Sequence, residues 1–324
     1  FPAAKVDLSN PDAWEWYKGV IKENMLGIGL SGWMADYGEY LPTDAVLAGA
    51  DPERYHNRYP AEWARLNYEA VWEAGKLDDT VVFMRAGYTG SSRYAHSIWA
   101  GDQMVDWSRH DGLPSVIPAA LSSGMVGVGV SHSDVGGFTS LFSRRRTKEL
   151  LMRWAEHSAF TPIMRSHESN RPGDNWQWDG DEATAEHVAR MARIFVALAP
   201  YRRAALEEYY QRGLPVMRPP VIHYPGHAHV RSAPPPGARA NARGSDERSA
   251  YRYLLGRDLL VAPVVRPGVA SASLTLPADE WVHLWSGRRF SAGRAVVDAP
   301  IGRPPVFYRA GSDYAELFAA VAEM

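Results

Sequence analysis

The sequence contains no cysteine, which excludes disulfide bonds, thiolate nucleophiles and thiolate metal sites. No hydrophobic run approaches the length that a membrane-spanning helix needs. The formal net charge is only −2 and no basic tail is present, so we expect neither nucleic acid nor a membrane as a partner. The lack of cysteine is compatible with a reducing cytosol, and we therefore expect a cytoplasmic protein.

Aromatic residues are plentiful, with 12 Trp and 16 Tyr among 324 residues. Most of these rings are expected in the core of a large α/β domain, which a chain of this length can bury. Aromatic walls also favour sugar binding, because the apolar face of a pyranose ring stacks on them.

The first two thirds of the sequence predict strands that alternate with helices. Apolar strands are expected at 26–35, 80–85, 97–100, 125–132 and 161–165, and helices at 10–24, 60–74, 113–123, 144–158 and 184–206. This alternation is typical of a parallel sheet covered on both faces. Five strand–helix units are visible and the chain opens at Phe1, so we expect the C-terminal portion of a (β/α)8 TIM barrel over 1–212 and a longer protein upstream.

The pattern changes near residue 213. Residues 227–249 are rich in Pro, Gly, Ala and Arg and predict a long loop. Short strands are then expected at 254–265, 273–276, 281–285, 294–298 and 306–309. We therefore predict a small antiparallel, β-sandwich-like domain over 213–324.

Two aspartates follow apolar strands of the expected barrel, Asp36 and Asp102. Active sites of β/α barrels lie at these C-terminal strand ends. Glycoside hydrolysis needs such a pair, in which one carboxylate attacks the sugar and the other protonates the leaving oxygen. Each aspartate could instead cap a turn, and Asp106 is a weaker candidate beside Asp102.

The surroundings of each aspartate fit one of the two roles. Arg85, at the end of the next strand, would keep Asp36 ionised, or would form a structural ion pair there. Trp99 and Trp107 would give Asp102 the apolar surroundings that a protonated acid needs.

The last two expected strands end in HSD (132–134) and RSHE (165–168). We expect Asp134 and His167 to bind sugar hydroxyls, with support of neighbouring side chains as the alternative. A metal site is disfavoured, because no third ligand stands at a suitable spacing.

Several stretches resemble glycoside hydrolase family 31, most closely its sulfoquinovosidase branch. The resemblance covers nearly the whole chain, from Trp14 to Phe318, and its most specific segment is MADYGEYLP (34–42). The other segments are FMRAGYTGSSRYAHSIWAGDQMVDWS (83–108), HSDVGGF (132–138), FTPIMRSHESNRPGDNWQWDGD (160–181), LLGRDLLVAPV (254–264) and APIGRPPVFYRAGS (299–312).

The resemblance implies a retaining α-glycosidase, bacterial and cytoplasmic, that needs no cofactor and acts alone or as a homo-oligomer. Asp36 would be the nucleophile and Asp102 the acid/base, and the implied substrates are α-sulfoquinovosides such as sulfoquinovosyl glycerol or sulfoquinovosyl diacylglycerol. The residues expected to contact the substrate are Trp33, Glu39, Arg85, Asp134, Phe138 and His167.

One position departs from the branch. Its HSDxGGY motif ends in a Tyr whose hydroxyl helps to recognise the sulfonate, and this chain has Phe138 there. The Arg and Trp that complete sulfonate recognition would precede Phe1. The alternatives are therefore an α-glucosidase or α-xylosidase of the same family, or a truncated inactive fragment.

Overall fold

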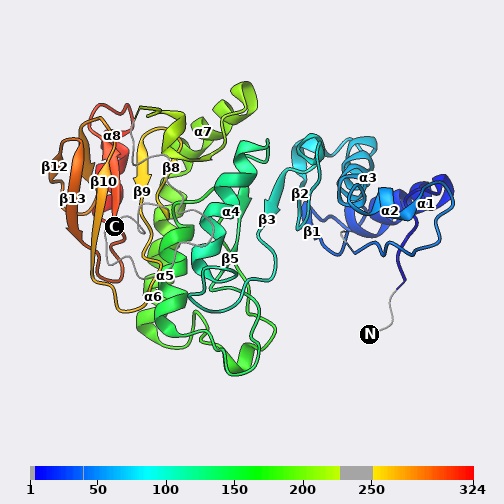
Figure 1. Cartoon of the computed structure of the whole chain (residues 1–324), viewed down its shortest axis with the longest axis horizontal. Coiled ribbons are helices and arrows are strands. Elements are labelled where there is room, and N and C mark those ends of the chain that lie inside the picture. The colour runs from blue at the N-terminus through cyan, green and yellow to red at the C-terminus, as the bar shows by residue number, and fades with distance from the viewer. Residues whose placement is uncertain (1–3, 39, 227–250) are drawn as a thin grey trace. The chain divides into compact units, whose positions relative to one another are not determined.

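The computed structural model describes residues 4–38, 40–226 and 251–324 (Figure 1). The chain forms two compact units, Phe1–Gly101 and Asp102–Met324. Each unit buries its own clusters of hydrophobic side chains.

The first unit begins with helices that the sequence predicts well. Asn10 caps the first helix, because its Oδ1 accepts a hydrogen bond of 2.9 Å from the Asp12 N–H, and Pro11 occupies the first turn. The helical elements are α1 (Pro11–Ile21), the π-helical turn η1 (Lys22–Leu26), α2 (Pro52–His56), α3 (Tyr59–Glu73), and the 3₁₀ turns η2 (Leu77–Asp79) and η3 (Ser91–Arg93).

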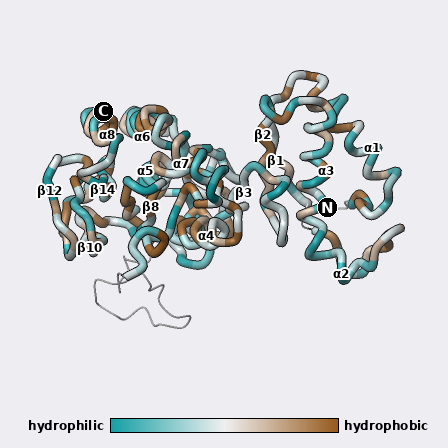
Figure 2. Tube along the Cα trace, turned by 90° about the horizontal axis from the view of Figure 1, so that it is seen from above, coloured by the Kyte–Doolittle hydropathy of each residue, from teal (hydrophilic) through white to brown (hydrophobic). Residues whose placement is uncertain are grey.

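Three short parallel strands follow one another in this unit: β1 (Gly32–Ala35), β2 (Val81–Met84) and β3 (Ser97–Trp99). In the register of β1 and β2, Ala35 faces Met84, so the residues that follow these two strands are neighbours. Figure 2 shows β2 in the brown of hydrophobic residues. Buried side chains of α3, including Ala64 and Val71, cluster with Val82 of β2.

Three predicted strands are much shorter than expected. Of the segment 161–165, only Arg165 belongs to a strand, β6 (Arg165–Ser166). The segment 26–35 forms a strand only at Gly32–Ala35, because the helix continues through Leu26 and Gly29 turns the chain with a φ of 93°. The segment 125–132 forms only β4 (Ser131–His132), because the preceding helix extends to Met125. The apolar runs in 26–35 and 125–132 resemble strands, but their glycines at alternate positions favour turns.

The second unit continues the alternation of strands and helices. Its elements here are α4 (Leu113–Met125), β4, β5 (Asp134–Val135), α5 (Lys148–Ser158), β6 (Arg165–Ser166), the 3₁₀ turn η4 (Pro172–Asp174), α6 (Glu182–Ala197) and α7 (Ala199–Arg212). β5 and β6 pair in parallel. The single helix expected at 184–206 is two helices, because Pro200 in the first turn of α7 cannot donate a hydrogen bond into a continuous helix.

The C-terminal part is antiparallel, as predicted. The strands are β7 (Met217–Arg218), β8 (Tyr253–Leu255), β9 (Leu259–Val261), β10 (Ser271–Leu276), β11 (Trp281–His283), β12 (Arg289–Phe290), β13 (Gly293–Asp298) and β14 (Val306–Arg309), with the 3₁₀ turn η5 (Pro220–Ile222) and helix α8 (Ala315–Ala322). One sheet has the order β12-β11-β14-β9-β8-β7, and β10 pairs with β13.

These two antiparallel sheets share one core. Leu254 and Phe307 of the larger sheet cluster with Leu274 and Val297 of the smaller one. In Figure 1 the strands β10, β12 and β13 lie together with α8, which the sequence did not predict. The predicted loop 227–249 lies outside the described residues.

The described residues thus form an α/β fold of parallel strands and helices, followed by a small antiparallel β region. Within the same ranges, no helix combines the length and the apolar character that crossing a membrane requires.

Candidate active site

Asp36 directly follows β1, and its carboxylate is paired with an arginine from the next strand. Arg85 Nη2 lies 3.0 Å from Asp36 Oδ1, because the parallel register that sets Ala35 opposite Met84 brings the next residue of each strand together. The same carboxylate oxygen accepts the N–H of Tyr37 at 2.7 Å. The arrangement expected from the sequence is therefore present around Asp36.

Aromatic rings surround the guanidinium of Arg85. Its Cζ lies 5.3 Å from the ring centroid of Tyr37, 5.0 Å from that of Tyr40 and 5.9 Å from that of Trp99. The Tyr40 hydroxyl also accepts a hydrogen bond of 2.8 Å from Arg85 Nη2. These contacts fix the cation in front of Asp36, since a guanidinium is attracted to aromatic faces.

Trp33, a predicted substrate contact of this unit, is hydrogen-bonded to another side chain. The indole N–H of Trp33 donates to Asn67 Oδ1 at 2.8 Å, so the polar group of this side chain is hydrogen-bonded within the protein. Glu39 lies outside the described residues.

In the second unit, the buried carboxylate of Asp134 forms an ion pair with Arg165, which is only partly buried. They face each other in the register of β5 and β6, and Arg165 Nη2 donates to Asp134 Oδ1. Burial raises the pKa of Asp134, and the positive charge of Arg165 opposes this effect. Arg165 also donates from Nε to His132 Nε2 at 3.1 Å. Burial, assisted by the charge of Arg165, lowers the pKa of His132 to about 3, which keeps this ring neutral.

His167 and Phe138 form an edge-to-face pair, with ring centroids 4.6 Å apart and an angle of 74° between the ring planes. The Ser169 N–H donates to His167 Nδ1 at 3.3 Å. In the neutral ring this contact leaves the proton on Nε2, which can then donate to a ligand. Phe138, although it lacks a hydroxyl, therefore packs against a predicted substrate-binding histidine.

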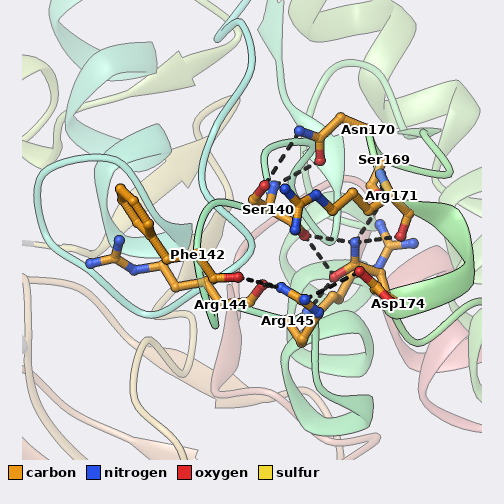
Figure 3. Close-up of polar contacts among 10 residues, drawn as sticks. Ser140, Phe142, Arg144, Arg145, Ser169, Asn170, Arg171 and Asp174 are labelled. Atoms are coloured by element: carbon orange, nitrogen blue, oxygen red, sulfur yellow. Dashed lines mark hydrogen bonds and ion pairs between the residues drawn. The ribbon is translucent and has the colours of Figure 1, made fainter.

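A polar network ties together the loops that carry Phe138 and His167 (Figure 3). The Ser140 N–H donates to Asn170 Oδ1 at 2.8 Å, and Asn175 Nδ2 donates to the hydroxyls of both Ser140 and Ser169, at 2.7 and 2.8 Å. Arg145 adds an ion pair with Asp174 at 3.2 Å. The buried side chains of this network hold both loops in one conformation.

Asp102 begins the second unit, and its side chain is exposed. The Asp102 carbonyl accepts a hydrogen bond of 2.8 Å from the Thr139 hydroxyl, and the next carbonyl, of Gln103, accepts the N–H of Phe138 at 2.8 Å. The negative charge of Asp102 also contributes to the raised pKa of Asp134, after burial. The second unit thus brings Asp102, Asp134, Phe138 and His167 to one region.

The sequence interpretation missed Arg165. Arg165 stands two residues before His167, at the end of the strand opposite Asp134, and this position could have indicated that it belongs to the site. In the ranges that the structure describes, no group of three or more His, Asp or Glu side chains could hold a metal ion.

Comparison with known proteins identifies the family. The model of the "Glycosyl hydrolases family 31 TIM-barrel domain" matches residues 2–203, and that of the "Glycosyl hydrolase family 31 C-terminal domain" matches residues 213–312. These matches confirm the predicted fold class, a TIM-barrel portion followed by a β domain.

Two curated relatives are similar over almost all of this chain. The sulfoquinovosidase of Escherichia coli (strain K12) is 53% identical over 322 residues, which are 99% of this chain and 45% of that protein. The sulfoquinovosidase of Agrobacterium fabrum is 49% identical over 326 residues, which are 98% of this chain and 46% of that protein. This chain therefore spans a little less than half the length of these relatives.

A solved structure agrees with them. The family 31 sulfoquinovosidase from E. rectale, in complex with the aza-sugar inhibitor IFGSQ, has a TM-score of 0.91 and 49% identity, covering 98% of this chain and 45% of that one. The chain belongs to glycoside hydrolase family 31.

Proposed function

We propose that this chain supplies the catalytic carboxylates of a retaining α-glycosidase that hydrolyses α-sulfoquinovosides, such as sulfoquinovosyl glycerol or sulfoquinovosyl diacylglycerol. The observation that carries the proposal is the ion pair of Asp36 with Arg85 at the end of β1. The names of the relatives that are 49–53% identical support the choice of sugar.

The proposed mechanism has two displacements. Asp36 attacks the anomeric carbon while Asp102 gives its proton to the leaving oxygen, which forms a glycosyl ester on Asp36. Asp102 then takes a proton from water, and this water opens the ester and restores both groups. Such a mechanism requires carboxyl groups about 5–5.5 Å apart.

The other proposed contacts bind the sugar. Asp134 is charge-balanced by Arg165, so its carboxylate can accept hydrogen bonds from sugar hydroxyls. His167 donates from Nε2, and Phe138 and Trp33 offer ring surface. Glu39 is proposed only from the resemblance of its motif.

We also propose the domain division 1–212 and 213–324. The two family matches, over 2–203 and 213–312, support it. A cytoplasmic location is proposed from the absence of cysteine.

The test is to replace each carboxylate in the full-length protein. Asp36→Asn should reduce turnover of an aryl α-sulfoquinovoside to background, and Asp102→Asn should reduce kcat by about 100- to 10,000-fold. Asp106→Asn is the matched control, because this side chain is already engaged by the Ser108 N–H at 2.8 Å and by Arg144 at 2.8 Å. It should retain most of the turnover.

Retained turnover in Asp36→Asn or Asp102→Asn would contradict the assignment of that residue. If the unmodified protein instead hydrolyses the matched aryl α-glucoside or α-xyloside faster than the α-sulfoquinovoside, the result is consistent with the mechanism but contradicts the sulfonate specificity.

A further inference from the structure

Trp63, on α3, contacts the backbone on both sides of Asp36. Its indole Nε1 donates to the carbonyl of Ala35 at 3.2 Å. On the other side, Gly38 lies so close to the indole that a Cβ at this position would be 1.9 Å from Trp63 Cδ1. One side chain therefore fixes the residue before Asp36 and the second residue after it.

The Trp63 ring is itself held in place. It stacks on Tyr17 of α1, with ring centroids 5.2 Å apart and an angle of 29° between the planes. Asn67, which is buried, donates to the Trp63 carbonyl at 2.9 Å and accepts the indole N–H of Trp33 at 2.8 Å. Two indole groups thus connect β1 to α3.

The backbone between these contacts is strained. Tyr37 has a φ of 62°, in the left-handed region that a bulky side chain rarely adopts. Its N–H donates to Asp36 Oδ1 at 2.7 Å, so this conformation also orients the carboxylate. Strain of this kind persists only where the surrounding structure fixes it, and the contacts of Trp63 do so on both sides.

We propose that Trp63 is a positioning residue for the reaction: it sets the direction of the Asp36 carboxylate through its contacts with Ala35 and Gly38. This inference rests on the proposed function of Asp36. A nucleophile displaced by about 1 Å loses about 100-fold in rate, so the backbone that carries it must be held closely.

The test is Trp63→Phe in the full-length protein. Phenylalanine keeps an aromatic ring against Tyr17 and removes the N–H that Ala35 accepts. We expect kcat on an aryl α-sulfoquinovoside to fall about 10- to 100-fold, with KM within about twofold of the unmodified value. Gly38→Ala, which pushes against the indole from the other side, should give the same change in kcat without a change in KM.

Trp72→Phe is the matched control, because Trp72 lies on the same helix and is 61% exposed. It should leave both constants unchanged. The inference is overturned if Trp63→Phe keeps kcat within about twofold. It is also overturned if its loss of kcat comes with an equal rise in KM and a lower melting midpoint, which a purely structural role would give.

The same experiment separates this inference from the proposed function. If the Asp36→Asn protein stays active, both the proposed function of Asp36 and the role of Trp63 are contradicted. If the Asp36→Asn protein is inactive and the Trp63→Phe protein is unchanged, only the role of Trp63 is contradicted.

Discussion

Two acidic residues of the candidate site lie beside an arginine from the neighbouring parallel strand, but they differ in burial. The Asp36 side chain is 21% exposed, whereas that of Asp134 is only 2% exposed. The anomeric carbon of the substrate must be able to approach the nucleophile. A carboxylate that only binds sugar hydroxyls needs no more than one accessible oxygen. The more open aspartate therefore suits attack, and the buried one suits recognition of hydroxyls.

His157, a residue outside this site, should make the fold sensitive to acid. It is wholly buried on α5, where its Nδ1 lies 3.3 Å from the Tyr253 hydroxyl, and burial lowers its pKa to about 3. In the unfolded chain the ring titrates near its usual pKa of about 6.5. Between these values only the unfolded chain binds the proton, so the stabilisation is complete above about pH 6.5 and is lost as the pH falls.

The test is to compare melting midpoints at about pH 7.5 and about pH 5. At pH 5 the protonation of His157 in the unfolded chain should cost the fold about 2 kcal/mol. His157→Asn removes the titrating ring, so the variant should lose less stability than the unmodified protein between the two pH values. The acid sensitivity that remains comes partly from His187 and His223, whose pKa values burial also lowers, to about 4 in each case.

His110→Asn, at an exposed position, is the control and should show the same pH dependence as the unmodified protein. An equal loss of midpoint in His157→Asn and in the unmodified protein would contradict the prediction.

Individual site residues were predictable where strand order alone sets their position. The neighbours Asp36 and Arg85 follow from two parallel strands that end together, and the Asn10 cap follows from local sequence. Trp63 was not predictable as a contact of the Asp36 loop, because its partners are backbone groups of Ala35 and Gly38, which carry no side-chain signal. Arg165 was missed for a related reason: its partner depends on the register of β5 and β6.

At the scale of elements, helices were predicted better than strands. Residues 60–74 were expected as a helix and form α3 at Tyr59–Glu73, because apolar side chains recur at helical spacing over four turns. By contrast, β4, β5 and β6 have two residues each. Strands this short form only because of the neighbouring strands with which they pair. A local sequence window of about ten residues does not show which distant segment will be the partner.

Helix α5 should depend on one buried ion pair for its attachment to the antiparallel region. Arg153 Nη1 lies 2.9 Å from Glu156 Oε2, and their side chains are 2% and 1% exposed. Arg153 also donates to the carbonyls of Val269 and Ala299, and Glu156 accepts the Gly302 N–H at 2.5 Å. These contacts connect α5 to the loops before β10 and after β13.

Glu156→Gln should therefore destabilise the protein by about 3–5 kcal/mol, because the buried charge of Arg153 loses its counterion. The measurement is the melting midpoint, together with amide hydrogen exchange of residues 299–302, which should become faster. Glu186→Gln on α6, where the side chain is exposed, is the matched control and should change neither. A midpoint equal to that of the control would show that the ion pair contributes little.

At the scale of the whole molecule, the proposed reaction needs both compact units, since Asp36 belongs to the first and Asp102 to the second. The sequence placed both residues at strand ends, but the distance between two carboxylates depends on long-range packing that no local pattern encodes. The family 31 TIM-barrel match over residues 2–203 includes residues of both units.

The stereochemistry of the product tests the proposed pairing of Asp36 with Asp102. Carboxyl groups about 5–5.5 Å apart allow Asp36 to form a covalent intermediate, and the second displacement then restores the α configuration. A separation of about 6.5–9.5 Å would instead admit a water molecule and invert the anomeric carbon. We expect proton NMR of a fresh hydrolysate, made by the full-length protein from an aryl α-sulfoquinovoside, to show the α-anomer first. The β-anomer should appear only as the sugar mutarotates, which an equilibrated sample calibrates. Initial release of the β-anomer would exclude Asp36 as the nucleophile of a double displacement.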